Sequence, residues 1–211
     1  MTEPMTQTLW HIRGALPGRS SVAADFVRAN PGVMLTEHAP GLLLHVFARR
    51  GASADVRRMI GAEVGCEVPT QGCVTIGARG SVVWSGPGQW LVMADPKSAV
   101  SRTLPDALAG SAAVIDQSAS RLMVRLSGKD VRRCLGKVVG IDLHPAVFAV
   151  GHAAMTDLAH VPVHLWRLID ADGHAVFDLA APRSYAASVW HTLAAAAAEY
   201  GLEAPPLEDA R

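Results

Sequence analysis

Two stretches of this chain decide how it folds: Ser53-Ala-Asp-Val-Arg-Arg-Met-Ile-Gly61 and Gly128-Lys-Asp-Val-Arg-Arg-Cys-Leu-Gly136. They share the segment Asp-Val-Arg-Arg, with Asp55 and Asp130 in register. The apolar residues of each stretch follow helical spacing, and an acidic residue near the start is favourable at a helix N-terminus. The sequence therefore predicts the same helix twice.

The repetition extends beyond these helices. Val64-Gly65 returns as Val139-Gly140, and Met93-Ala-Asp-Pro-Lys-Ser98 returns as Leu179-Ala-Ala-Pro-Arg-Ser184. The second pair lies further apart than the first, so the second copy contains an insertion, which we place within 142–152. Each copy predicts the order strand, helix, two or three strands, helix. We therefore expect an α+β fold made of duplicated split-βαβ (ferredoxin-like) units.

Hydrophobic periodicity and the Gly and Pro residues between the runs give the predicted elements. In the first copy we expect strands over 42–47, 73–76, 81–84 and 90–93 and helices over 53–64 and 96–109. In the second copy we expect strands over 122–126, within 153–169 and over 175–179, and helices over 129–139 and 184–200. The predicted divisions are an N-terminal arm over 1–40 with a short helix around 22–28, repeats over 41–115 and 116–202, and a tail over 203–211.

The composition excludes several classes of protein. Of 211 residues, 50% are apolar and 18% charged, which is typical of a folded chain and excludes general disorder. The 19 basic and 19 acidic residues cancel, so no excess positive charge indicates nucleic-acid binding. The apolar runs are too short to cross a bilayer, and the first residues lack a signal-peptide pattern. Three cysteines without a CxxC pair indicate reduced thiols. We expect a cytoplasmic protein that binds neither nucleic acid nor membranes.

The residues by themselves predict no catalytic or metal site. The sequence contains no GxSxG motif and no phosphate-binding glycine loop. His160 and His164 share one face of a predicted strand, but no third ligand with a recognised metal spacing accompanies them. Asp116 lies in a polar loop, where its carboxylate either caps an Asx-type turn or pairs with a cationic or amide-bearing ligand.

Five tryptophans are an unusual share of a chain with few aromatic residues. Trp84, Trp90, Trp166 and Trp190 fall inside predicted elements, where packing in the core is the default expectation. Trp10 lies in the arm, where its side chain packs either on its own domain or on another subunit.

Several blocks of the sequence together carry a family resemblance: Val114-Ile-Asp-Gln-Ser118, residues 121–128, Ile141-Asp-Leu-His-Pro145 with Phe148, Gly151 and Thr156, His164-Leu-Trp-Arg167, and Pro182-Arg-Ser-Tyr-Ala186 with Trp190 and Leu193. In this order they resemble the gamma subunit of heterotetrameric bacterial sarcosine oxidase. Trp84-Ser-Gly-Pro-Gly-Gln-Trp-Leu91 resembles the family's Gly-Pro-acidic-Trp-Leu loop, although Gly88-Gln89 stands where the family often has an acidic pair. The blocks span about residues 40–200. The family is similar to the folate-binding aminomethyltransferase fold, which agrees with the duplicated α+β unit.

The resemblance implies a complex of four different subunits. In it an alpha subunit carries NAD and a folate site, a beta subunit carries FAD and covalent FMN, and a delta subunit carries zinc. Together they oxidise sarcosine to glycine, passing the methyl carbon to tetrahydrofolate and electrons to oxygen. The gamma chain is not known to carry the redox chemistry, so the resemblance implies a structural subunit with no cofactor or metal of its own.

The resemblance also suggests residues that maintain the family structure or contact partner subunits. These candidates are Trp10, Trp84, Trp90, Asp142, His144, Trp166, Arg183 and Trp190. Two other readings stay open. The chain is either the small subunit of an oxidase for another N-methyl amine, or a stand-alone folate- or pterin-binding protein in which Asp116 pairs with the pterin amide edge.

Overall fold

The computed structural model describes residues 16, 31–38 and 41–204. These residues form two sheets, and the first has five antiparallel strands. Their order is β3-β4-β5-β2-β6. The bounds are β2 Leu42–Ala48, β3 Val74–Gly77, β4 Gly80–Gly86, β5 Gln89–Ala94 and β6 Ala112–Asp116. Helices α2 (Ser53–Val64) and α3 (Val100–Ala107) cover one face of this sheet, where their buried leucines, valines and isoleucine meet the apolar side chains of β2, β4 and β5.

The second sheet has six strands in the order β11-β1-β7-β10-β9-β8. The bounds are β1 Val33–Glu37, β7 Arg121–Ser127, β8 Ala153–Leu158, β9 Val161–Ala171, β10 His174–Pro182 and β11 Leu202–Glu203. All neighbours are antiparallel except β1 and β11, which run parallel. Helices α4 (Val131–Leu135) and α5 (Ala186–Ala197) cover one face, and the short 3-10 helices η1 (Arg183–Tyr185) and η2 (Ala198–Tyr200) flank α5.

The two sheets repeat one topology, as the sequence predicts. Strand β2, helix α2, strands β3, β4 and β5 and helix α3 correspond in order to β7, α4, β8, β9, β10 and α5. The segment 136–152 that joins α4 to β8 is longer than the segment 65–73 that joins α2 to β3, which locates the predicted insertion. Helix α4 is shorter than the expected 129–139, because the chain leaves the helix at Gly136 and continues in tight turns.

Strand β1 differs from the sequence-based expectation of an arm over 1–40. Its side chains alternate between buried and more exposed, and Val33 and Leu35 are fully buried against the core beneath the six-stranded sheet. This strand pairs with β7, which lies far along the chain, so no local pattern could reveal its partner. The helix expected around 22–28 and the tail beyond 204 lie outside the described residues.

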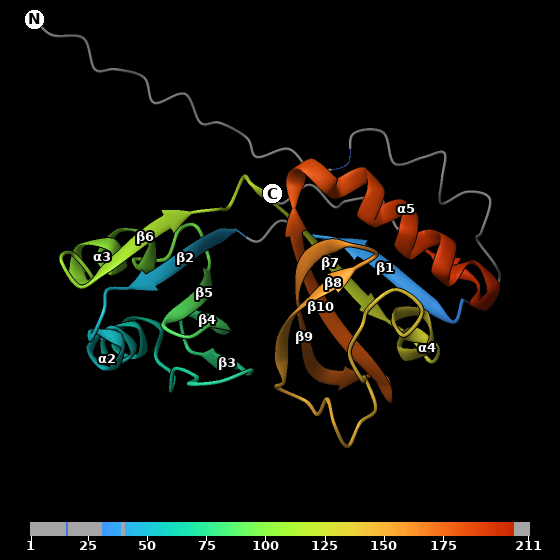
Figure 1. Ribbon diagram of the computed structural model, residues 1–211, viewed down its shortest axis with the longest axis horizontal. Coiled ribbons are helices and arrows are strands. Elements are labelled where there is room, and N and C mark those ends of the chain that lie inside the picture. The colour runs from blue at the N-terminus through green and yellow to red at the C-terminus, as the bar shows by residue number, and fades with distance from the viewer. Residues whose placement is uncertain (1–15, 17–30, 39–40, 205–211) are drawn as a thin grey trace, which may run out of the picture.

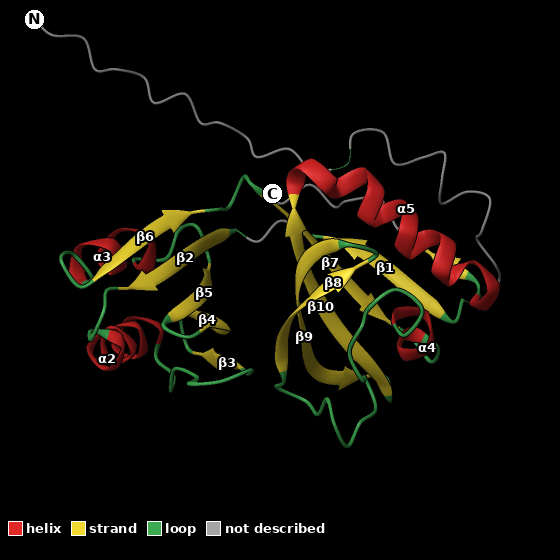
Figure 2. Cartoon of the chain, in the orientation of Figure 1, coloured by secondary structure: helices red, strands yellow, loops and turns green. Residues whose placement is uncertain are grey.

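The layers run helices, sheet, sheet, helices. Figure 1 and Figure 2 show α2 and α3 on the outer side of one sheet and α4 and α5 on the outer side of the other. The inner faces of the sheets meet in a third apolar cluster, which contains Leu43, Val83 and Leu91 from one sheet and Met123 and Trp166 from the other. Any site between the sheets is therefore built from strands of both repeats.

Candidate functional site

An apolar layer divides the space between the two sheets into two polar ends. Trp166 on β9 lies in this layer and is almost fully buried between the sheets. Each strand that faces the other sheet runs from one polar end past the apolar layer to the other end. Because alternate residues of a strand face the same side, every second residue contributes to these three regions in turn. On β7, for example, Arg121, Met123 and Arg125 belong to one end, the layer and the other end in turn.

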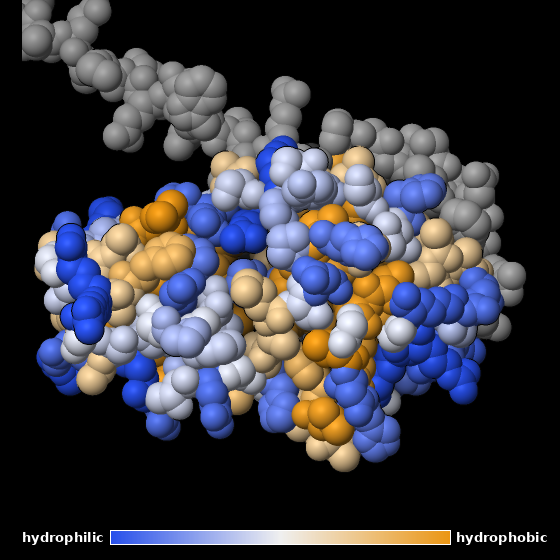
Figure 3. Space-filling view, in the orientation of Figure 1, coloured by the Kyte–Doolittle hydropathy of each residue, from blue (hydrophilic) through white to orange (hydrophobic). Residues whose placement is uncertain are grey.

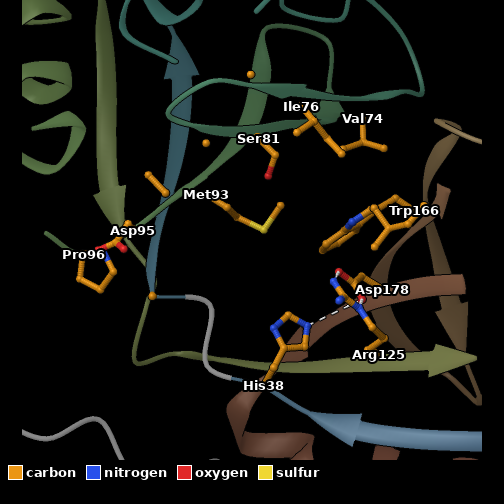
Figure 4. Close-up of a pocket in the computed structure, with 15 residues that line it drawn as sticks. His38, Val74, Ile76, Ser81, Met93, Asp95, Pro96, Arg125, Trp166 and Asp178 are labelled. Carbon is orange, nitrogen blue, oxygen red and sulfur yellow. Dashed lines mark hydrogen bonds and ion pairs between the residues drawn. The ribbon is translucent and has the colours of Figure 1, made fainter. Parts of the chain in front are cut away.

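The first end is an open cleft of about 520 Å³. Figure 4 shows Met93 and Ile76 from the five-stranded sheet opposite Trp166, Arg125 and Asp178 from the six-stranded sheet. This cleft joins apolar walls to a small group of charged side chains, as ligand sites commonly do.

Two of the charged side chains in the cleft, Arg125 and Asp178, are paired with each other. Arg125 Nε and Nη2 donate to the two carboxylate oxygens of Asp178, each at 2.8 Å, and His38 Nε2 lies 3.8 Å from Asp178 Oδ1. The buried Asp178 carboxylate raises the pKa of the Arg125 guanidinium above its ordinary value. Because this fork uses both carboxylate oxygens of Asp178, the two side chains present a neutralised ion pair to the cleft. The exposed Asp95, which also lines the cleft, accepts the backbone N–H of Lys97.

The second end holds a buried cluster of two histidines and a serine. Ser85 Oγ lies 3.1 Å from His45 Nε2 and 2.8 Å from His164 Nε2, which joins β2 and β4 of one sheet to β9 of the other. Burial, aided by the nearby Arg121 charge, lowers the pKa of each imidazole from 6.5 to about 4. Both rings are therefore neutral at pH 7. A hydroxyl donates one proton, so one ring accepts from Ser85 and the other donates to it.

This cluster resembles a nucleophile beside a base, but its burial gives it a different task. Ser85, His45 and His164 are all at least 94% buried, and so a substrate has no access to the Ser85 hydroxyl. The hydrogen bonds instead satisfy the Ser85 hydroxyl and the Nε2 atom of each ring, which would be costly to leave unpaired between the sheets. The sequence analysis missed this cluster and the Arg125–Asp178 pair. The signal that could have indicated the cluster is a polar residue within an otherwise apolar strand, such as His45 in β2.

Asp116 takes part in a turn. Its Oδ1 accepts from the backbone N–H of Ser118 at 2.8 Å and from the Ser118 hydroxyl at 2.6 Å, while Ser118 Oγ also accepts from the backbone N–H of Leu43. This is the Asx-type turn that the sequence analysis offered as one reading of Asp116. The next residues continue the network, since Arg121 Nε donates to Gln117 Oε1 at 2.9 Å.

The inserted loop 141–151 brings several of the family blocks together. Arg167 is buried on β9, where its Nη1 donates to the carbonyl of Phe148 at 3.1 Å and its Nη2 to Asp170 at 2.9 Å. The backbone N–H of Gly151 donates to the Arg167 carbonyl at 2.9 Å. The Phe148 ring stacks on Phe177 of β10. These contacts fix the loop on the six-stranded sheet.

Asp142 and His144 lie in this loop and shape its turn. Asp142 Oδ1 accepts from the backbone N–H of His144 at 2.8 Å, and His144 Nδ1 accepts from the backbone N–H of Ala146 at 3.3 Å. Both side chains are exposed to solvent. Val147 and Val150 in the same loop are about half exposed.

The remaining candidate residues are distributed through the fold. Trp90 is buried beneath the five-stranded sheet and its Nε1 donates to the Pro69 carbonyl at 2.8 Å, whereas Trp84 opposite it is half-buried. Each sheet and the helices that cover it form one lobe, and Trp190 lies on α5 in the core of the six-stranded lobe. Arg183 begins η1, and its backbone N–H donates to the Ser120 carbonyl. The structure does not gather these residues into one site. Trp10 lies outside the described residues.

The predicted histidine face is not realised as a metal site. His164 lies within β9, but His160 falls in the turn before it with a φ of 72°, outside the strand. No group of three metal-binding side chains occurs within residues 31–38 and 41–204. Burial raises the pKa of the Cys134 thiol to about 11, so this cysteine stays protonated. No helix in the described part of the chain is long and apolar enough to span a membrane.

Comparison with known proteins identifies the family. The family model described as sarcosine oxidase, gamma subunit family matches residues 50–199. The chain belongs to the sarcosine oxidase gamma subunit family. This confirms the resemblance based on the sequence blocks.

Curated relatives and solved structures agree with this family assignment. The chain is 40% identical over 111 residues to a sarcosine oxidase subunit gamma from Arthrobacter sp. and 40% identical over 88 residues to one from Corynebacterium sp. strain U-96. These matches cover 51% and 41% of this chain and 55% and 43% of the relatives. The chain therefore spans about half the length of the curated relatives that it matches.

The structural likeness is more extensive. A chain of heterotetrameric sarcosine oxidase from Corynebacterium sp. U-96, in complex with pyrrole 2-carboxylate, matches with a TM-score of 0.74 and 30% identity. The match covers 85% of this chain and 90% of that one. The glycine cleavage system aminomethyltransferase T from Bartonella henselae matches with a TM-score of 0.59 and 13% identity, over 87% of this chain and 50% of that chain. This second likeness confirms the expected fold of this gamma subunit family member.

Proposed function

We propose that this chain is the non-catalytic, structural gamma subunit of a flavin-dependent heterotetrameric sarcosine oxidase in the cytoplasm. In this proposal the complex demethylates sarcosine to glycine oxidatively and passes the methyl carbon to tetrahydrofolate. The alpha subunit holds NAD and the folate, the beta subunit FAD and FMN, and the delta subunit zinc. The observation that carries the proposal is the match to a chain of heterotetrameric sarcosine oxidase over most of both chains.

The internal chemistry of the chain supports a structural role. Arg125 and Asp178 in the cleft neutralise each other through a two-bond fork. The histidines at the other end are neutral and buried around Ser85. The Ser85 cluster joins the two sheets, whereas the Arg125–Asp178 fork joins β7 and β10 within one sheet. In flavin enzymes the cofactor supplies the redox chemistry and protein supplies position and enclosure. We propose that this chain helps to enclose the flavin and folate compartments.

Omitting this chain from the assembled enzyme tests the proposal. The partner subunits would be co-expressed with and without the chain, and each preparation assayed for subunit composition, flavin per complex, sarcosine turnover and the fraction of methyl carbon recovered on tetrahydrofolate. We expect loss of assembly, of flavin content or of folate coupling without the chain. An assembled complex with unchanged flavin, turnover and coupling would contradict the proposal.

Asp116 distinguishes this role from a stand-alone pterin-binding protein. Its Oδ1 accepts two hydrogen bonds from Ser118, which favours a turn-forming role. Titration of the isolated full chain with tetrahydrofolate is expected to show no saturable binding. Saturable binding that is lost in Asp116→Ala, but kept in the exposed control Asp106→Ala, would favour the pterin-binding function instead.

A further inference from the structure

Strand β6 forms one outer edge of the five-stranded sheet, and none of the described strands pairs with its free side. The backbone N–H of Gln117 donates to the Leu43 carbonyl at 2.8 Å, and the Ser111 carbonyl likewise accepts an N–H just beyond the end of β2. These two bonds show that the odd-numbered residues face β2. Antiparallel ladder bonds alternate, so the N–H groups of Val114 and Asp116 point to the free side.

Apart from its short length and the charge of Asp116 at its end, this edge lacks the features that protect exposed sheet edges. Its sequence is Ala112-Ala-Val-Ile-Asp116, with neither lysine nor proline, and its register with β2 is continuous without a bulge. Ile115 is 48% exposed. Figure 3 shows an apolar patch on the surface over the position of β6. Proteins usually cover or block such an apolar edge, because it offers a ready template for another strand.

The second sheet shows how the equivalent edge is covered. Strand β1 occupies the place next to β7 that β6 occupies next to β2, and both run antiparallel to their neighbour. Strand β11 adds to the outer side of β1 in parallel, with Val33 opposite Leu202. The backbone N–H of Val33 donates to the Gly201 carbonyl at 3.1 Å. The six-stranded sheet therefore has one strand more than the five-stranded sheet.

The two equivalent strands differ in how deeply their side chains are buried. Both alternate along their length, with the more buried side chains packed against the helices. In β1 these side chains, Val33 and Leu35, are fully buried. In β6 the corresponding side chains, Ala112 and Val114, are only half-buried although they pack against the core of their lobe. A strand placed beside β6 would bury them further.

We propose that the free edge of β6 accepts an extended strand from a partner subunit of the oxidase complex. The added strand runs parallel to β6, hydrogen-bonds to the outward groups of Val114 and Asp116, and places apolar side chains over Ala112 and Val114. Main-chain pairing supplies affinity in this mode of recognition, and the alternate side chains supply specificity. The inference rests on the proposed function and names the contact through which the chain joins its complex.

The parallel addition of β11 to β1 favours a different chain as the occupant of the corresponding place beside β6. Two copies of β6 related by a twofold axis would pair antiparallel instead. A partner subunit can supply a parallel strand, and the likeness to a chain of a heterotetrameric enzyme supports the presence of such subunits.

Hydrogen exchange of the intact complex, captured through this chain, tests the proposal on the wild-type protein. Residue-resolved mass spectrometry would compare Val114 and Asp116 with Ala113 and Ile115, whose amides face β2. We expect all four amides to exchange slowly, and the outward pair at least 100-fold more slowly than an open strand edge. Rapid exchange of only the outward pair in an assembled complex would overturn the inference and leave the proposed function standing. If no other subunit is captured, both fail.

A photo-crosslinking residue in place of Ile115 identifies the occupant. We expect a product with the mass of this chain plus a partner subunit. A product with the mass of two copies of this chain, or a crosslink to its own residues 1–15, would overturn the inference. Val114→Pro adds a second test, because it removes an outward N–H and no bond to β2, with Val114→Ala as its matched control. We expect at least tenfold less captured partner for Val114→Pro only. Unchanged capture by the folded proline variant would contradict the strand pairing.

Discussion

The two histidines between the sheets make the stability of this chain depend on pH. Their pKa of about 4 in the folded protein lies below the ordinary value of 6.5, so the unfolded chain binds protons that the folded chain excludes. The contribution of the two neutral histidines to the free energy of unfolding is therefore fully present above pH 6.5 and is lost as the pH drops toward 4. At pH 5 the loss is roughly 2 kcal/mol per histidine. We expect His164→Gln, which cannot titrate but can still hydrogen-bond to Ser85, to lose about half of this dependence.

Urea unfolding at pH 7, 6 and 5 measures this effect. His174→Gln is the matched control, because His174 is exposed at the start of β10. The control should follow the wild-type pH dependence. If His164→Gln also follows it, protonation of the buried cluster does not determine acid stability.

At the scale of elements, the Arg167 side chain holds the inserted loop 141–151 on β9. Its bond to the Phe148 carbonyl is buried, and removing one partner of a buried charge-assisted bond costs roughly 1–3 kcal/mol. We expect Arg167→Met to speed amide exchange at Gly151 and His152 by at least tenfold while exchange in β4 and β5 stays unchanged. Arg133→Met, which removes an exposed guanidinium on α4, should leave the loop amides unaffected. Equal exchange in both variants would exclude the proposed clamp.

Some elements of this fold could be predicted from the sequence and others could not. The repeated helix stretches 53–61 and 128–136 predicted the duplication correctly, because each copy carries its own local helix and strand signals. Strand β1 was missed because its pairing partner, β7, is far along the chain and its flanks are rich in Gly and Pro. The contacts of Ser85 with His45 and His164 join residues from both repeats, so they depend on how the sheets face each other. Periodicity within one strand contains no information about that arrangement.

At the scale of the whole molecule, Trp166 joins the two repeats into one folding unit. It is 1% exposed and packs in the apolar layer with Leu43 and Leu91 of the opposite sheet. Trp166→Ala leaves a cavity between the sheets, and large-to-small substitutions of this kind cost about 3–5 kcal/mol. We expect a lower midpoint in urea and, because each lobe keeps its own helix-covered core, a broader transition. Trp84→Ala, at a half-buried position on one sheet, is the control and should lower the midpoint less while keeping the transition sharp. If the two variants shift the midpoint equally, the cooperative unfolding of the two sheets does not depend on Trp166.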